Sequence, residues 1–145
     1  MTQQTRYALS EGTLTLPEAA QDTSVTILKL PQARATLVVT RAYDVKPGQE
    51  EAYLQQQLAK VKRDMKKFSA RAVEDSSFGP LPARAVSVRF ENQGIAIEQQ
   101  LLVVRLESHL LVLTFSTSAG FAADAQATWE QIRQGFIPAG NAAEA

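Results

Sequence analysis

The sequence contains no cysteine, and His109 is the single histidine among its 145 residues. The absence of cysteine excludes a disulfide framework, thiol catalysis, a thiolate metal site and a lipidated N-terminal cysteine. One histidine without cysteine also argues against a zinc site. The sequence has neither a glycine-rich phosphate loop nor the Gly-x-Ser-x-Gly turn of hydrolases. We therefore expect no metal and no cofactor.

Long apolar runs and an excess of charge are missing as well. The N-terminus lacks the basic start and apolar stretch of a signal peptide. The longest apolar runs, Leu101–Val104 and Leu110–Leu113, have the length of strands and not of membrane spans. Fifteen basic residues balance fifteen acidic ones, so nothing attracts the whole chain to nucleic acid or to an anionic membrane. We expect a cytoplasmic protein that binds neither.

The most informative stretch that is present is Gln21–Pro31, which predicts a strand with defined ends. It begins with polar residues, continues with alternating β-branched ones and ends at a proline. Val25 and Ile27 would point to one side of a sheet, whereas Leu28 and Leu30 would point to the other. A strand that is apolar on both faces lies between two layers or is covered by a partner.

The rest of the chain predicts an α+β fold. Thr36–Arg41 is expected to pair antiparallel with Val25–Leu30 after a short loop. An amphipathic helix of roughly 18 residues follows Pro47 and ends near Lys67. The remaining expected elements are a short pair of strands around Glu11-Gly12, a short strand at 70–75, a loop or hairpin tip at 76–83, strands at 85–90, 95–106 and 110–117, and a helix at 122–136.

This order predicts a mainly antiparallel twisted sheet with both helices packed on one face. Residues 1–138 would form a single domain, and residues 139–145 a disordered tail. Val25, Ile27 and Val38 would then lie on the face that the helices leave uncovered. An uncovered apolar face is a liability unless something binds it, so we expect a hydrophobic groove there.

Signals that resemble catalytic or nucleic-acid chemistry are weak. His109 lies in a turn between two strands, and a hydrolase that combines it with Ser108 or Ser116 is a remote alternative. The basic residues of 60–67 complement the dipole at the end of the first helix and solvate its outer face. The amides of Gln99 and Gln100 interrupt an apolar strand, and a buried amide needs partners. Structural pairing and ligand binding both remain open for them.

The stretch Gln21–Pro31 resembles the signature strand of the effector-associated gene chaperones of bacterial type VI secretion. The resemblance continues in order through 37–41, 53–58 and the strand that contains Gln100. It ends at Trp129-Glu130-Gln131-Ile132 and Ile137-Pro138. It thus covers nearly the whole chain, and its specificity lies in the collinear set and not in one sharp motif.

The resemblance implies a PsbP-like fold, a homodimer and no enzymatic activity. It also implies a partner, namely the N-terminal transmembrane segments of a PAAR-containing effector, which often carries Rhs repeats. The chaperone would shield these segments in the cytoplasm and aid loading onto the secretion spike. Carried over by position, the residues of the groove would be Val25, Ile27, Val38, Gln57, Val61, Met65 and Gln100.

The alternative hypothesis is a non-catalytic binding module that uses the same face for a lipid or a small apolar ligand. It would retain extractable lipid, whereas the chaperone would retain a protein with apolar N-terminal helices.

Overall fold

The computed structural model describes residues 5–107, 109–118 and 123–138. Its first elements are a hairpin, β1 (Thr5–Leu9) and β2 (Gly12–Leu16), which pairs only with itself. The remaining elements, in chain order, are β3 (Thr26–Leu30), β4 (Ala35–Ala42), α1 (Glu50–Asp64), β5 (Lys66–Ala70), β6 (Glu74–Phe78), β7 (Leu81–Asn92), β8 (Ile95–Arg105), β9 (Leu110–Thr117) and α2 (Ala123–Gln134).

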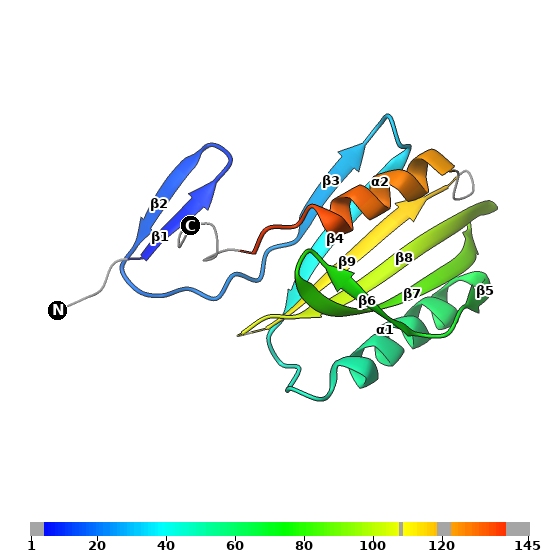
Figure 1. Ribbon diagram of the computed structural model, residues 1–145, viewed down its shortest axis with the longest axis horizontal. Helices are drawn as coiled ribbons and strands as arrows, with labels where there is room; N and C mark the ends of the chain where they lie inside the picture. Colours follow the sequence, from blue (N-terminus) through cyan, green and yellow to red (C-terminus); the bar gives the residue numbers. More distant parts are fainter. Residues whose placement is uncertain (1–4, 108, 119–122, 139–145) are drawn as a thin grey trace.

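The main sheet has seven strands in the order β3-β4-β9-β8-β7-β5, with β6 also paired to β7. Every pairing is antiparallel. Strand β3 therefore forms one edge, and β9 and β8 lie at the centre (Figure 1). The predicted α+β class with a mainly antiparallel sheet is confirmed, and the fold is consistent with the PsbP-like arrangement.

The two helices pack on opposite faces of this sheet, so the prediction that both lie on one face is wrong. The α2 face, in front of the sheet in Figure 1, contains Leu102, Leu113 and Phe115 around Trp129. The α1 face contains Leu101, Val103 and Val112 around Leu54 and Leu58 of α1. Because neighbouring residues of β8 and β9 are apolar and point to opposite faces, each face needs its own cover.

Helix α1 is shorter than the sequence predicted, since it ends at Asp64 and Lys66–Ala70 form strand β5. Glu50 and Glu51 lie in its first turn, where acidic side chains favour the helix dipole. Phe68 reaches the core beneath α1 from strand β5. A residue on an edge strand can make the same apolar contact as a residue in the last turn of the helix. The helical periodicity of the sequence does not distinguish these two cases.

The stretch 76–83, which the sequence predicts as a loop or hairpin tip, is a tight hairpin, because β6 continues to Phe78 and β7 begins at Leu81. The strand expected at 70–75 is divided between the end of β5 and the start of β6. Gly79 adopts φ 57° and its N–H donates to the carbonyl of Arg133 at 2.6 Å. This contact fixes the end of α2 over the hairpin, and Phe78 stacks on Phe136 there. The expected disordered tail lies outside the described residues.

Candidate functional site

The candidate site is the part of the α1 face that α1 does not cover, which we call the open face. It consists of side chains from β3, β4, β9 and β8 that share this face by register. Ile27 pairs with Val38, Val38 pairs with Thr114, and Ser116 pairs with Gln99. Thr40 lies two residues beyond Val38 on β4 and therefore points the same way. Val25 directly precedes β3.

The apolar residues at the edge of the open face are strongly exposed. Ile27 is 60% and Val25 56% exposed, whereas Val38 is half-buried. The floor beside them is formed by half-buried hydroxyl side chains of Thr40, Thr114 and Ser116. This arrangement offers non-directional apolar contact at the edge and small polar groups on the floor. Small and hydroxyl side chains let a helix approach closely and form hydrogen bonds with it.

Helix α1 borders the open face with its β4-facing side. Gln57 lines a hollow together with Ala42, Tyr43 and Tyr53, so its amide lies at the boundary between helix and sheet. Val61 and Met65 are half-buried and pack against the core beneath α1. Ile27, Val38, Gln57, Val61 and Met65 thus lie on the α1 side of the sheet and not on a face that both helices leave uncovered. Their role in binding stays a prediction.

Gln100 is the predicted site residue that does not lie on this face. It pairs with Phe115 and Ser87, both of which point toward α2. Its Oε1 accepts a 2.8 Å hydrogen bond from the Ser87 hydroxyl, and it lines a polar hollow between α2 and β6–β7. The neighbouring amide, Gln99, lies on the open face, because a shift of one residue along a strand reverses the face.

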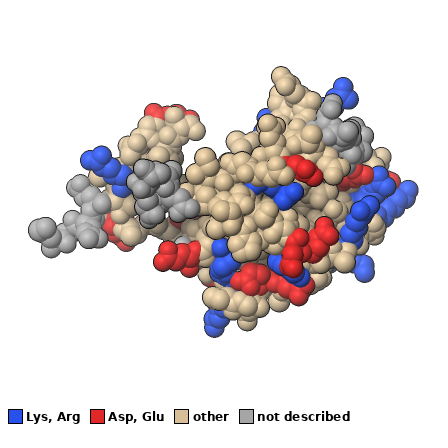
Figure 2. All heavy atoms as spheres, in the orientation of Figure 1, with Lys and Arg blue, Asp and Glu red and all other residues tan. Residues whose placement is uncertain are grey.

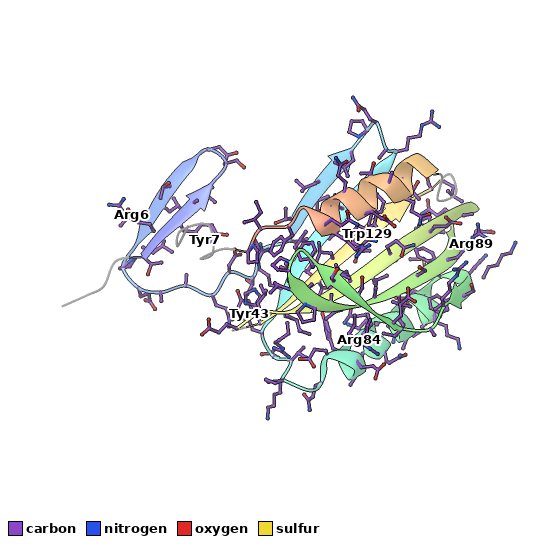
Figure 3. The ribbon with its side chains drawn as sticks, in the orientation of Figure 1. Arg6, Tyr7, Tyr43, Arg84, Arg89 and Trp129 are labelled. Carbon is purple, nitrogen blue, oxygen red and sulfur yellow. The ribbon has the colours of Figure 1, made fainter. Side chains whose placement is uncertain are left out.

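A hydrogen-bond network holds the segment that leads into β3. The Asp22 carboxylate accepts bonds from the Ser24 N–H at 2.9 Å and from the Ser24 hydroxyl at 2.6 Å. The Tyr7 hydroxyl also donates to this carboxylate, and the Tyr43 hydroxyl donates to the Asp22 carbonyl at 2.8 Å. Tyr7 and Tyr43 are labelled in Figure 3. The Ser24 and Tyr7 bonds lower the pKa of Asp22 to about 2. Sequence reasoning missed this network, although the Asp-x-Ser spacing is typical of such turns.

The geometry gives no support to a hydrolase. The His109 ring lies against the Tyr43 ring, tilted by 33° with a centroid distance of 4.7 Å, and burial together with Arg41 lowers the pKa of His109. Ser116 lies near the far end of β9, six residues beyond Leu110, which at about 3.4 Å per residue is roughly 20 Å away. Ser108 lies outside the described residues.

In the described part of the chain, no three His, Asp or Glu side chains are grouped so that they could hold a metal ion. None of its helices has the length and apolar character needed to cross a bilayer. Basic and acidic side chains lie next to one another over the β6–β7 half of the molecule (Figure 2), with Arg84 paired to Glu51 and Asp75. The surface there is mixed in sign.

Comparisons with known proteins agree with this architecture. A family model described as DcrB matches residues 11–135. A curated Pseudomonas aeruginosa protein named "Effector EagT6" is 22% identical over 138 residues, which are 92% of this chain and 96% of that protein. This match confirms the resemblance that the sequence indicated.

Among solved structures, the fold is similar to that of PA94, a Pseudomonas aeruginosa protein described as of unknown function. The TM-score is 0.74 at 24% identity, with 93% of this chain and 96% of the other covered. At this identity the likeness concerns the fold alone.

Proposed function

The chain belongs to the DcrB family, and on this premise we propose that it is a cytoplasmic, non-catalytic chaperone of type VI secretion. The match to EagT6 supports an effector-associated role in that system. In the proposed function, the chain binds the N-terminal transmembrane segments of a PAAR-containing effector, with or without Rhs repeats, and shields them until the effector is loaded onto the spike. It acts as a homodimer.

The observation that carries this proposal is the exposure of Ile27 and Val25, 60% and 56% respectively. They extend the apolar surface of Val38 to the edge of the sheet, on the face bordered by Gln57 of α1. Large exposed apolar surfaces mark places where another molecule binds. A long apolar helix is a suitable occupant, because the open face runs across four neighbouring strands.

The energetics of such binding are favourable. A transmembrane helix of about 20 residues exposes on the order of 1,000 Å² of apolar surface in water, and covering it yields roughly 25 kcal/mol at about 25 cal/mol/Å². Losses of translational, rotational and side-chain freedom offset much of this gain. Gln57 and Gln99 supply amides that pair with polar or backbone groups of the client helix and set its register.

The proposal is tested by detergent-free affinity capture of the tagged chain from its native cells, with mass spectrometry of the bound proteins. We expect one large protein with apolar N-terminal helices, and its capture should be lost when those helices are deleted. Ile27→Asp should abolish capture while the cooperative thermal unfolding of the chain is retained. Leu28→Asp is the matched control, because Leu28 is 47% exposed on the opposite face of the same strand.

Three results would contradict the proposal. Equal loss of capture with both variants would show that the open face is not the specific site. Recovery of extractable lipid without any protein would favour the binding module for an apolar ligand. Loss of cooperative unfolding in Ile27→Asp would place Ile27 in the core and overturn the assignment of the face.

A further inference from the structure

A polar hollow lies on the α2 side of the sheet, next to the apolar core that α2 covers. Strands β7 and β8 form its floor, α2 forms one wall, and the stretch from β5 to β6 forms the other (Figure 1). Its volume of about 620 Å³ is within the range of roughly 300–1,000 Å³ that is usual for ligand sites. On the floor, Ser87 is hydrogen-bonded to Gln100, and Arg89 is paired with Glu98. These four side chains thus satisfy one another.

The walls of the polar hollow carry four further charged side chains that lack a partner of opposite charge. Within residues 5–107, 109–118 and 123–138, the side chains of Arg71, Glu74 and Glu130 form no ion pair or hydrogen bond. Arg133 donates to the Ser76 hydroxyl and to the carbonyl that follows it, at 3.1 Å each, and both acceptors are neutral. A charged ligand can therefore contact all four without displacing an ion pair of the protein.

The pairing with β7 fixes the order of these charges along the sheet wall. Ser76 and Glu74 pair with β7 residues that are two positions apart. The Arg71 N–H donates at 2.9 Å to the carbonyl of Ser87, which lies two positions farther along β7. Ser76, Glu74 and Arg71 thus mark three levels of the polar hollow, spaced by about 7 Å.

Helix α2 adds its charges at the first two of these levels. Its hydrogen bonds hold Arg133 at the first level. The direction of α2 follows from Trp129, which stacks on Phe115 at the third level. Glu130 precedes Arg133 by three residues, which corresponds to about 4.5 Å along a helix and to the same side of it. Glu130 therefore lies near the second level, across the polar hollow from Glu74, and the order of levels is basic, acidic, basic.

We propose that the polar hollow binds an extended segment of a partner protein in which acidic, basic and acidic residues occupy every second position. Side chains on one side of an extended chain recur every two residues, or about 6.8 Å, which matches the spacing of the levels. The basic residue lies between Glu74 and Glu130, and the acidic residues contact Arg133 and Arg71. Such charge complementarity determines which segment binds more than how tightly it binds.

The occupant is a different protein and not a second copy of this chain. Asp44 and Asp64 are the only acidic residues of the sequence with a basic residue two positions later, and neither has an acidic residue four positions later. The inference does not rest on the proposed function. The open face lies on the α1 side of the sheet and the polar hollow on the α2 side, so both can be occupied at once.

The test is an NMR titration of the isotope-labelled full chain with the capped peptide Thr-Glu-Thr-Lys-Thr-Glu-Thr at low ionic strength. Threonine favours the extended conformation. We expect saturable shifts of the Ser76, Ser87 and Gln100 amides, and weaker binding in high salt, which screens exposed charges. The matched peptide Thr-Lys-Thr-Glu-Thr-Glu-Thr has the same composition and net charge. It should bind about two- to fivefold more weakly, because every alignment loses at least one ion pair.

Two variants of the chain complete the test. Glu130→Gln should weaken binding of the first peptide by about two- to fivefold. Glu51→Gln removes the same charge from α1 on the other side of the sheet and should leave binding unchanged. Equal affinity for the two peptides, or equal affinity of Glu130→Gln and the wild type, would overturn the order of charges. The absence of saturable shifts around the polar hollow would overturn the site.

A third variant separates this inference from the proposed function. Ile27→Asp changes the open face alone and should bind the first peptide as the wild type does. Loss of effector capture in this variant with unchanged peptide binding would show that the two sites are independent. Loss of peptide binding in Ile27→Asp would overturn the assignment of the peptide to the polar hollow.

Discussion

Strands β9 and β3 both carry large apolar side chains on both faces, but the sheet buries those of β9 and exposes those of β3. In β9, Leu110, Leu113 and Phe115 are at most 2% exposed. In β3, Ile27 and Leu28 are 60% and 47% exposed. Strand β9 lies at the centre between α1 and α2, whereas β3 forms the edge beyond both helices.

The comparison shows that apolar character on both faces predicts a strand that needs two covers, but not where those covers come from. For β9 they come from the chain's own helices. In β3 the described residues leave Ile27 and Leu28 about half or more in water, although Leu30 packs against the core beneath α2. In the proposed function, the client covers the face of Ile27. The same pattern therefore serves folding in one strand and binding in the other.

The largest expected effect separates the buried centre of the sheet from its exposed edge strand β3 by the same substitution. Leu102→Ala on β8, beside β9, should lower the free energy of unfolding by about 2–5 kcal/mol, because it leaves a cavity in a fully buried site. Leu28→Ala should cost less than about 1 kcal/mol, since nearly half of its side chain is already in water. Chemical denaturation of both variants measures the difference. Equal losses would show that β3 belongs to the folding core.

A second prediction concerns the contact that attaches the end of α2 to the β6–β7 hairpin. A Cβ at Gly79 would lie 2.2 Å from the carbonyl oxygen of Phe136, whereas a Cβ at Gly94 would have nothing within 4 Å. Both glycines have positive φ. Gly79→Ala should therefore cost about 2–4 kcal/mol, from left-handed strain and steric overlap together. Gly94→Ala should cost about 1 kcal/mol, from strain alone. Similar melting temperatures for the two variants would mean that α2 is not fixed by this contact.

The sequence predicted the elements of this fold better than their arrangement. Alternation in Val25–Leu30 and Thr36–Arg41 predicted both strands and their antiparallel pairing, and it placed Ile27 and Val38 on one face. An amphipathic helix shows that one of its sides is covered, but its periodicity does not say by which face of a sheet. The consecutive apolar runs Leu101–Val104 and Leu110–Leu113 were the signal that both faces of the sheet are covered, because such runs are typical of strands buried on both faces.

The candidate site was predictable only in part for the same reason. Val25, Ile27 and Val38 belong to one short, regular hairpin, so their common face follows from the period of two. Gln100 lies far along a long strand, where an uncertainty of one residue reverses the face. The floor residues Thr40 and Thr114 carry no sequence signal of their own. They belong to the site because the pairing of β4 with β9 places them on the same face as Val38.

A third prediction concerns the attachment of the hairpin at the exposed edge. The pKa of Asp22 is about 2 in the folded chain, against an ordinary value of 3.8, so its deprotonated form stabilises the attachment. This contribution is complete above pH 3.8 and is lost as the pH falls through about 2. In an NMR titration, the Ser24 amide should shift with a midpoint near 2, and the hairpin amides should lose their native shifts in the same range. Asp22→Asn should release the hairpin at neutral pH as well.

The outcome for the central strands provides the control for this titration. Amides of β8 and β9 should keep their native shifts through the range in which the hairpin responds, because their side chains are buried between the helices. A common midpoint for hairpin and central strands would indicate global acid unfolding. A midpoint near 3.8 would show that the Tyr7 and Ser24 bonds do not act on Asp22.

The smallest expected effect lies on the covered side, where ion pairs link α1 to the sheet. Arg84 on β7 donates to Glu51 of α1 at 2.9 Å, but the Glu51 side chain is 59% exposed. Exposed pairs contribute roughly 0–1 kcal/mol, because water screens the charges and ordering the side chains opposes the gain. Glu51→Gln should therefore lower the free energy of unfolding by less than about 0.5 kcal/mol, as measured by urea denaturation. A larger loss would show that α1 is held by charge, whereas a small one assigns its attachment to Leu54 and Leu58 in the core beneath it.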